Sequence, residues 1–119
     1  MGIKIAGVQI GSIWEDPVLS FKKADPYIRN AAEQGVAVIC FPEQYPTGWD
    51  PCSLRHVQKR EDRIVSRFRD LAQEYGIAIL GSFRERFFPK PRNTCIVVDS
   101  EGYEIASYSK CHLFTPAAE

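Results

Sequence analysis

Glu43 is the residue whose type and position first suggest chemistry. It follows an uninterrupted apolar run at 36–41, VAVICF, with only Pro42 between them. Such a run is typical of a parallel strand buried on both faces, and an unpaired charge beside it is costly. A carboxylate held away from water here would serve as a proton acceptor. On spacing alone, a solvated loop glutamate is the favoured interpretation.

Thiols are the second group of candidates. The chain has four cysteines and no Cys-x-x-Cys pair. Cys52 and His56 have the i, i+4 spacing of a helix, and Cys111 adjoins His112, but the ligand spacings of closed zinc sites are absent. The other two cysteines lie in apolar, strand-like runs, where a thiol packs as a small apolar side chain. We therefore expect reduced cysteines, no metal and no cofactor.

Hydrophobic periodicity predicts the elements that must position these groups. Residues 16–35 have helical spacing and begin with an Asp-Pro pair that is typical of a helix start. Pro26 lies inside this segment, and we expect it to kink the helix or to restart a shorter one. A second helix is predicted from about Glu61 to Tyr75, ended by glycine. Strands are predicted at residues 3–10, 36–41, 77–83, 94–99 and 103–109.

The last strand carries alternating side chains. The alternation places Tyr103, Ile105, Ser107 and Ser109 on one face, and Glu104, Ala106, Tyr108 and Lys110 on the other. By the same rule, Cys111 should face away from whatever Lys110 addresses. Residues 84–92, which are basic and contain proline, are expected to form a solvent-exposed turn.

The order β-α-β-α-β-β-β predicts an α/β fold with a partly parallel, mixed sheet and right-handed crossovers. Each helix has one apolar face, so one layer of two helices should cover one face of the sheet. The rest of this short chain offers little to cover the other face. That imbalance predicts association with another copy or a further portion of chain.

Composition and sequence patterns argue against several classes of protein. Fifteen Lys and Arg residues balance fifteen Asp and Glu residues, which disfavours a dedicated nucleic-acid or anionic-lipid binder. No apolar stretch is long enough to span a membrane, and residues 1–10 make a poor signal peptide. We therefore expect a cytoplasmic protein with no membrane or nucleic-acid partner. Gly7 and Gly11 do not form a Gly-x-Gly-x-x-Gly motif, which argues against nucleotide binding.

Five stretches of the chain resemble, in the expected order, the N-terminal part of the nitrilase, or carbon–nitrogen hydrolase, superfamily. They are IKIAGVQI (3–10), AAEQGVAVICFPE (31–43), LAQEYGIAILGSF (71–83), NTCIVVDSEG (93–102) and YSKCHLF (108–114). The strand that runs into Phe-Pro-Glu is moderately specific. The joint match with YSKCHLF, which puts Lys110 67 residues after Glu43, is strong.

The resemblance implies part of an α-β-β-α sandwich and a Glu-Lys-Cys catalytic group. Glu43 matches the general base and Lys110 matches the lysine. The family's nucleophilic cysteine lies a few tens of residues beyond that lysine, so we expect it to be missing from residues 1–119 and this chain alone to be inactive. Residues 1–119 are then the N-terminal part of one hydrolase domain. Glu119 has a plausible position for the family's second, substrate-orienting glutamate; a frayed terminal residue is the alternative.

The resemblance also implies a small amide, nitrile or N-carbamoyl substrate, hydrolysed through a thioester after release of ammonia or an amine. We expect a homo-oligomer that packs through the sheet, because a half-sandwich exposes apolar surface. An alternative from another class is a non-catalytic α/β module that binds a ligand or a partner. Glu43 and Lys110 should lie together in a water-poor pocket if the enzymatic interpretation is right.

Overall fold

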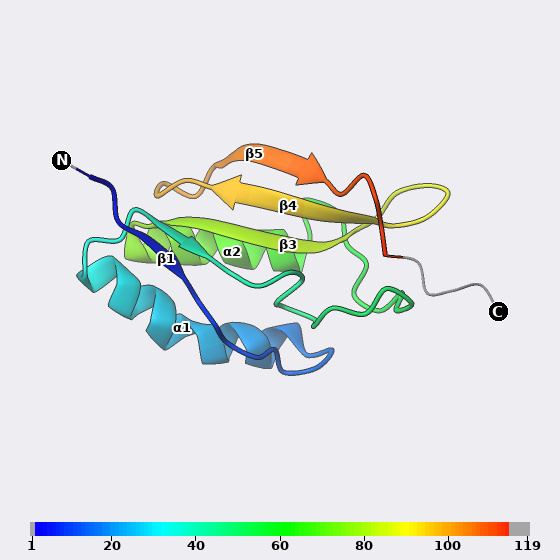
Figure 1. The fold of residues 1–119 in the computed structure, drawn as a ribbon, viewed down its shortest axis with the longest axis horizontal. Helices are drawn as coiled ribbons and strands as arrows, with labels where there is room; N and C mark the ends of the chain where they lie inside the picture. The colour runs from blue at the N-terminus through cyan, green and yellow to red at the C-terminus, as the bar shows by residue number, and fades with distance from the viewer. Residues whose placement is uncertain (1, 115–119) are drawn as a thin grey trace.

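The computed structural model describes residues 2–114 and contains a mixed sheet with two helices, drawn in Figure 1. Its strands lie side by side in chain order: β1 (Ile5–Gly7), β2 (Val38–Cys40), β3 (Ala78–Glu85), β4 (Arg92–Val98) and β5 (Glu104–Ser109). Strands β1 to β3 are parallel, whereas β4 and β5 add as antiparallel neighbours. The helices α1 (Pro17–Glu33) and α2 (Arg63–Tyr75) form the two crossovers. The predicted order of elements is confirmed.

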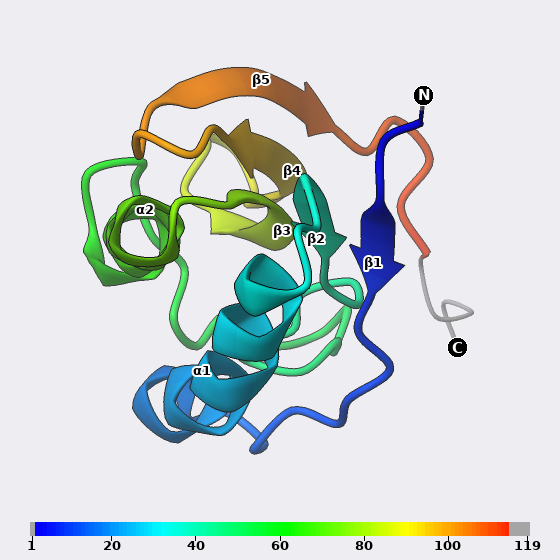
Figure 2. The ribbon, with the colours of Figure 1, turned by 90° about the vertical axis from the view of Figure 1, so that its left-hand side faces the viewer.

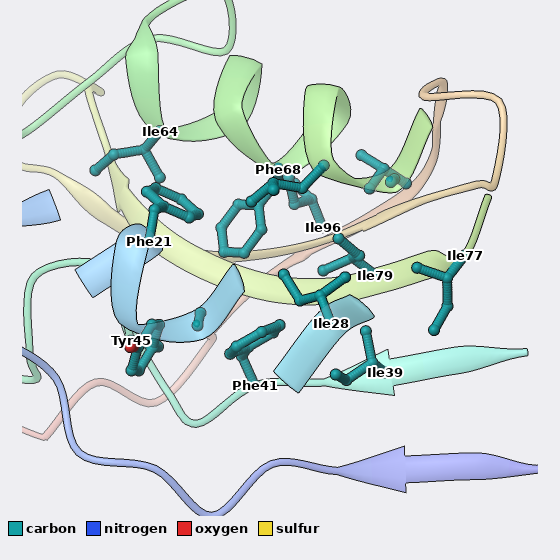
Figure 3. Packing of buried hydrophobic residues seen from close by; sticks show 14 of the residues in the cluster. Phe21, Ile28, Ile39, Phe41, Tyr45, Ile64, Phe68, Ile77, Ile79 and Ile96 are labelled. Atoms are coloured by element: carbon teal, nitrogen blue, oxygen red, sulfur yellow. The ribbon is translucent and has the colours of Figure 1, made fainter. Parts of the chain in front are cut away.

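Both helices lie on the same side of the sheet, as Figure 2 shows. Their apolar faces meet the inner side of β2, β3 and β4 in one core, shown in Figure 3. Phe68 of α2 contacts β3 at Gly81, where an added Cβ would come within 2.4 Å of the Phe68 ring. Glycine is therefore required for the close approach of α2 to the sheet. The predicted single layer of two helices is confirmed.

Helix α1 begins as predicted and continues through Pro26. The Asp16 carboxylate caps it by accepting a hydrogen bond from the Leu19 N–H at 3.0 Å. Pro26 lies inside α1, and the helix runs on from Pro17 to Glu33, so the expectation of a restarted, shorter helix is wrong. Buried Ala24 and Ile28 flank the proline. Their packing against the core stabilises the turn in which proline removes one N–H donor.

The other face of the sheet has a different character. Side chains that alternate with the buried core positions point away from the helices, and they are only partly buried within residues 2–114. They include Val38, Cys40, Leu80, Cys95 and Val97. We call this the open face, since neither helix covers it.

The structure corrects two predictions for the second half of the chain. Arg84 does not belong to an exposed turn: it lies in β3 and is 3% exposed. The regular alternation predicted for β5 is also wrong at its start, because Val97 pairs with Ala106 and Val98 pairs with Glu104. The residue between them, Ile105, forms a β-bulge, which moves Glu104 to the helix side opposite buried Val98.

Candidate active site

Glu43 lies in a tight turn just beyond the carboxyl end of β2. The Tyr45 N–H donates to the Pro42 carbonyl at 3.1 Å, and the Gln44 N–H donates to Ser82 Oγ of β3 at 2.7 Å. Gln44 and Tyr45 are buried, whereas Glu43 is exposed. The turn thus buries Gln44 and Tyr45, the two residues after Glu43, and leaves the Glu43 carboxylate accessible to solvent.

Lys110 directly follows β5, at the same end of the sheet. Its backbone N–H donates to the Asn93 carbonyl at 2.8 Å and so extends the ladder with β4. Its ammonium Nζ lies 3.0 Å from Oε1 of Glu43, which makes an ion pair and a hydrogen bond. The predicted approach of these two side chains, 67 residues apart in the chain, is present in the structure.

Asn93 joins this pair and was not among the predicted site residues. Its Nδ2 donates to Oε1 of Glu43 at 2.6 Å, the same oxygen that Lys110 contacts. Asn93 is buried near the start of β4, in the NTCIVVDSEG stretch. A carboxamide at the beginning of an apolar strand was the available signal, but only the folded structure shows that it meets Lys110 of the neighbouring strand end and Glu43 of the turn after β2.

The pair is more exposed than predicted. The Glu43 and Lys110 side chains are 45% and 38% exposed, so within residues 2–114 the expected water-poor setting is not formed. The reason is local: both residues lie just past the last pairs of their strands, on the side away from the helices. Lys110 lines a hollow of about 230 Å³, together with Trp49, Asn93 and Phe114 among others.

A second ion pair lies beneath the loop that follows Glu43. Nη1 of Arg84 is 2.7 Å from Oε1 of Glu15, and the two side chains are 4% and 5% exposed. Arg84 also donates to Ser53 Oγ and to the carbonyls of Gly48 and Arg55. These bonds hold the loop between Glu43 and α2 against β3.

The carboxyl group of Glu15 has a lowered pKa. Burial alone would raise the pKa, but the hydrogen bonds from Ser53 and Arg84 and the charge of Arg84 outweigh it. Glu15 therefore remains a carboxylate inside the protein, and each of its oxygens accepts a hydrogen bond. It serves the structure of the loop rather than proton transfer.

Tyr45, Trp49 and Cys111 lie near the pair in the sequence and have different surroundings in the structure. Tyr45 belongs to the core: it is fully buried, and its hydroxyl donates to the Ser20 carbonyl at 2.7 Å. Burial raises the pKa of Tyr45 to about 12. Trp49 contacts Phe114 edge-on beside the hollow, with ring centroids 5.5 Å apart. Cys111 lies 3.1 Å from the hydroxyl of Tyr108. Glu119 lies outside the described residues.

Other features of the described chain mark no competing site. Residues 2–114 contain no cluster of three His, Cys, Asp or Glu side chains suited to a metal ion. Neither helix there has the length and apolar character needed to cross a membrane. A larger hollow of about 680 Å³ lies between the helices, lined by residues such as Phe21, Ile64 and Arg67. It lies on the helix side of the sheet, away from Glu43 and Lys110.

Sequence comparisons show what the chain is similar to. Residues 4–119 match the family model described as carbon-nitrogen hydrolase. An omega-amidase of Pongo abelii is 33% identical over 112 residues, which cover 90% of this chain and 38% of that protein. A nitrilase of Pyrococcus abyssi is 29% identical, over 94% of this chain and 44% of its own length. The chain spans less than half the length of these relatives.

Solved structures agree with the sequence comparisons. An amidase from Nesterenkonia superposes with a TM-score of 0.84 at 29% identity, over 97% of this chain and 46% of the amidase. Another structure of that amidase shows acrylamide added to its active-site cysteine. The sheet, the two helices and their order are therefore shared with an enzyme more than twice the length of this chain.

Proposed function

Because the chain belongs to the carbon–nitrogen hydrolase family, we propose that it supplies the base and the cation for hydrolysis of a small amide. The observation that carries the proposal is the 3.0 Å contact between Lys110 Nζ and Glu43 Oε1. The two residues come from distant parts of the chain and meet beside a hollow at one end of the sheet. A surface ion pair contributes little to stability, so chemistry explains their convergence better than folding does.

In the proposed reaction, Glu43 accepts the proton of a cysteine thiol, and the thiolate attacks the amide carbon. An unactivated thiol is largely protonated at neutral pH, which is why a nearby base is needed. The Lys110 ammonium has three N–H donors. One meets Glu43, so the others are available to stabilise the oxyanion that forms on the substrate.

The tetrahedral intermediate then collapses, the carbon–nitrogen bond breaks, and the leaving nitrogen takes the proton from Glu43. A thioester remains. Water attacks it, Glu43 takes a proton from that water, and the acid is released as the thiol regains its proton. We propose that the nucleophile is a cysteine a few tens of residues C-terminal to Lys110, as the family resemblance implies. Cys111 is not a suitable candidate, because its thiol is directed to the hydroxyl of Tyr108.

Amides are the substrate class that the relatives favour. Those similar to this chain include omega-amidases, a 2-oxoglutaramate amidase and the Nesterenkonia amidase. Nitrilases are also among them, so nitriles are included among the substrates to be tested.

The apolar side chains of the open face support association with another copy of the chain or with a further portion of chain. Size-exclusion chromatography would detect such association.

A binding module without turnover is the second candidate. It is favoured by one observation: within residues 2–114, no cysteine thiol makes a hydrogen bond with Glu43 or Lys110. This candidate predicts that amides bind to the protein without release of ammonia. The hydrolase proposal predicts binding and release.

Ammonia release from a panel of aliphatic amides, dicarboxylic acid monoamides and nitriles tests the proposal, using the complete polypeptide that carries this chain. Glu43→Gln and Lys110→Met should each lower turnover by about 10²- to 10⁴-fold. Glu33→Gln and Lys59→Met, at exposed positions away from the pair, are the matched controls. Turnover in Glu43→Gln equal to that of the unchanged protein would show that Glu43 is not the base.

A further inference from the structure

Asn93 makes contacts with both members of the Glu43–Lys110 pair. It lies in β4 opposite Arg84 of β3, and its carbonyl accepts the backbone N–H of Lys110 at 2.8 Å. Its side-chain Nδ2 donates to the Glu43 carboxylate at 2.6 Å. One buried residue therefore fixes the backbone of the lysine and the side chain of the glutamate at once.

The two oxygens of the Glu43 carboxylate are not equivalent. Asn93 and Lys110 both donate to Oε1. Within residues 2–114, no hydrogen bond to Oε2 is present. An oxygen that already accepts two donors has little capacity for a third, whereas Oε2 keeps its lone pairs available. Within residues 2–114, the carboxylate is thus oriented with Oε1 bound to two donors and Oε2 without a hydrogen bond.

We infer that Asn93 is a positioning residue that holds Oε1 so that Oε2 is the oxygen that accepts the nucleophile's proton. The inference rests on the proposed function of Glu43 as a base. In this assignment the proton leaves the thiol sulfur and bonds to Oε2, and Oε1 stays bound to its two donors throughout.

The Asn93 side chain is better suited than the Lys110 side chain to hold the Glu43 carboxylate in one orientation. The Lys110 ammonium is at the end of a long, flexible side chain that is 38% exposed. The Asn93 side chain is short and buried, with its backbone held in the β4–β5 ladder. Its amide donates a hydrogen bond without a charge and without a proton that it could lose to the base. Lys110 therefore contributes the positive charge beside Glu43, and Asn93 fixes the orientation of the Glu43 carboxylate.

Asn93→Ala and Asn93→Asp test the inference in the complete polypeptide, with kcat and KM measured separately for the best amide. Loss of the fixed orientation of the Glu43 carboxylate should lower kcat, because a displacement of about 1 Å at a reacting group can reduce the rate 10²-fold. We expect kcat to fall about 10- to 100-fold in Asn93→Ala and further in Asn93→Asp. The aspartate repels Glu43 and competes for Lys110. KM should change less than about threefold, because Asn93 does not bind the substrate in this assignment.

Asn30→Ala is the matched control, since Asn30 lies on α1 and its side chain accepts a hydrogen bond from Gln34 at the surface; it should keep the original kcat. Asn93→Asp preserves shape and decides the question if Asn93→Ala fails to fold. If neither folds, or if kcat stays within twofold of the original, the assignment is wrong. It is also wrong if KM rises while kcat holds, which would mark a substrate contact. These outcomes are independent of the Glu43→Gln result. Normal turnover in Glu43→Gln would contradict the proposed function itself, whereas the Asn93 variants test only the positioning of Glu43.

Discussion

Two ion pairs lie near the same end of the sheet, and they differ in almost every physical respect. Arg84 and Glu15 are 4% and 5% exposed, and the guanidinium is surrounded by further acceptors. Lys110 and Glu43 are 38% and 45% exposed, and one carboxylate oxygen has no hydrogen bond within residues 2–114. Both carboxylate oxygens of Glu15 accept a hydrogen bond, whereas both hydrogen bonds to Glu43 within residues 2–114 go to the same oxygen.

The difference in exposure and hydrogen bonding indicates a structural role for the Arg84–Glu15 pair and agrees with the chemical role that we propose for the Lys110–Glu43 pair. A buried pair whose two carboxylate oxygens are both bonded within the protein can stabilise a loop, but it is not accessible to a ligand. A partly satisfied pair beside a hollow contributes little to stability and can act on a substrate. The buried pair holds the loop that follows Glu43, so the pair with a structural role supports the pair that we propose to be catalytic.

The largest expected effect comes from breaking the buried pair. Arg84→Met should lower the free energy of unfolding by about 3–5 kcal/mol, because Glu15 is left as an uncompensated buried charge. Urea denaturation followed by circular dichroism measures the loss. The double variant Arg84→Met/Glu15→Leu should recover part of it, since no charge remains buried. A loss below about 1 kcal/mol in the single variant would place the pair with ordinary surface pairs.

A smaller effect follows from acid. The pKa of Glu15 in the folded protein is below its ordinary value of 4.5, so the folded state favours the ionised form more than the unfolded chain does. This contribution to stability is complete above about pH 4.5 and is lost as pH falls through the lower folded pKa. The urea midpoint should therefore fall more steeply on acidification in the unchanged protein than in Glu15→Gln. Parallel curves would show that folding does not lower the pKa of Glu15.

The smallest effect on stability is expected at the exposed pair. Lys110→Met should change the free energy of unfolding by no more than about 1 kcal/mol, because its charge is accessible to solvent. The same urea measurement, with Lys59→Met as control, tests this value. A loss as large as that of Arg84→Met would show that Lys110 is a structural residue and would erase the contrast between the pairs.

Sequence patterns predicted the elements well because each depends on local chemistry. The Asp16 cap, the apolar stripe of α2 and the glycine that ends it are encoded within a few residues. Strand ends were less well predicted: β1 and β2 are shorter than their apolar runs, since pairing and not hydropathy limits a strand. The meeting of Glu43 and Lys110 was anticipated from the family resemblance.

The contacts that were missed depend on distant partners. Arg84 belongs to a basic stretch, and only its pairing with Glu15, 69 residues earlier, explains its burial. Asn93 has no local feature that marks a partner 50 residues away. The predicted dry environment around Glu43 was also wrong for residues 2–114, because an apolar strand says nothing about the turn that follows it.

The bulge in β5 has a consequence at the opposite end of the strand. Val98 lies opposite Glu104, and a regular ladder from there would bring Ser109 opposite Asn93. Because Ile105 is skipped, Thr94 pairs with Ser109, and Lys110 is the residue whose N–H meets the Asn93 carbonyl. Without that offset, a neutral hydroxyl would occupy the place of the ammonium. A single skipped residue near the turn thereby selects, at the far end of the strand, the charge presented to the carboxylate.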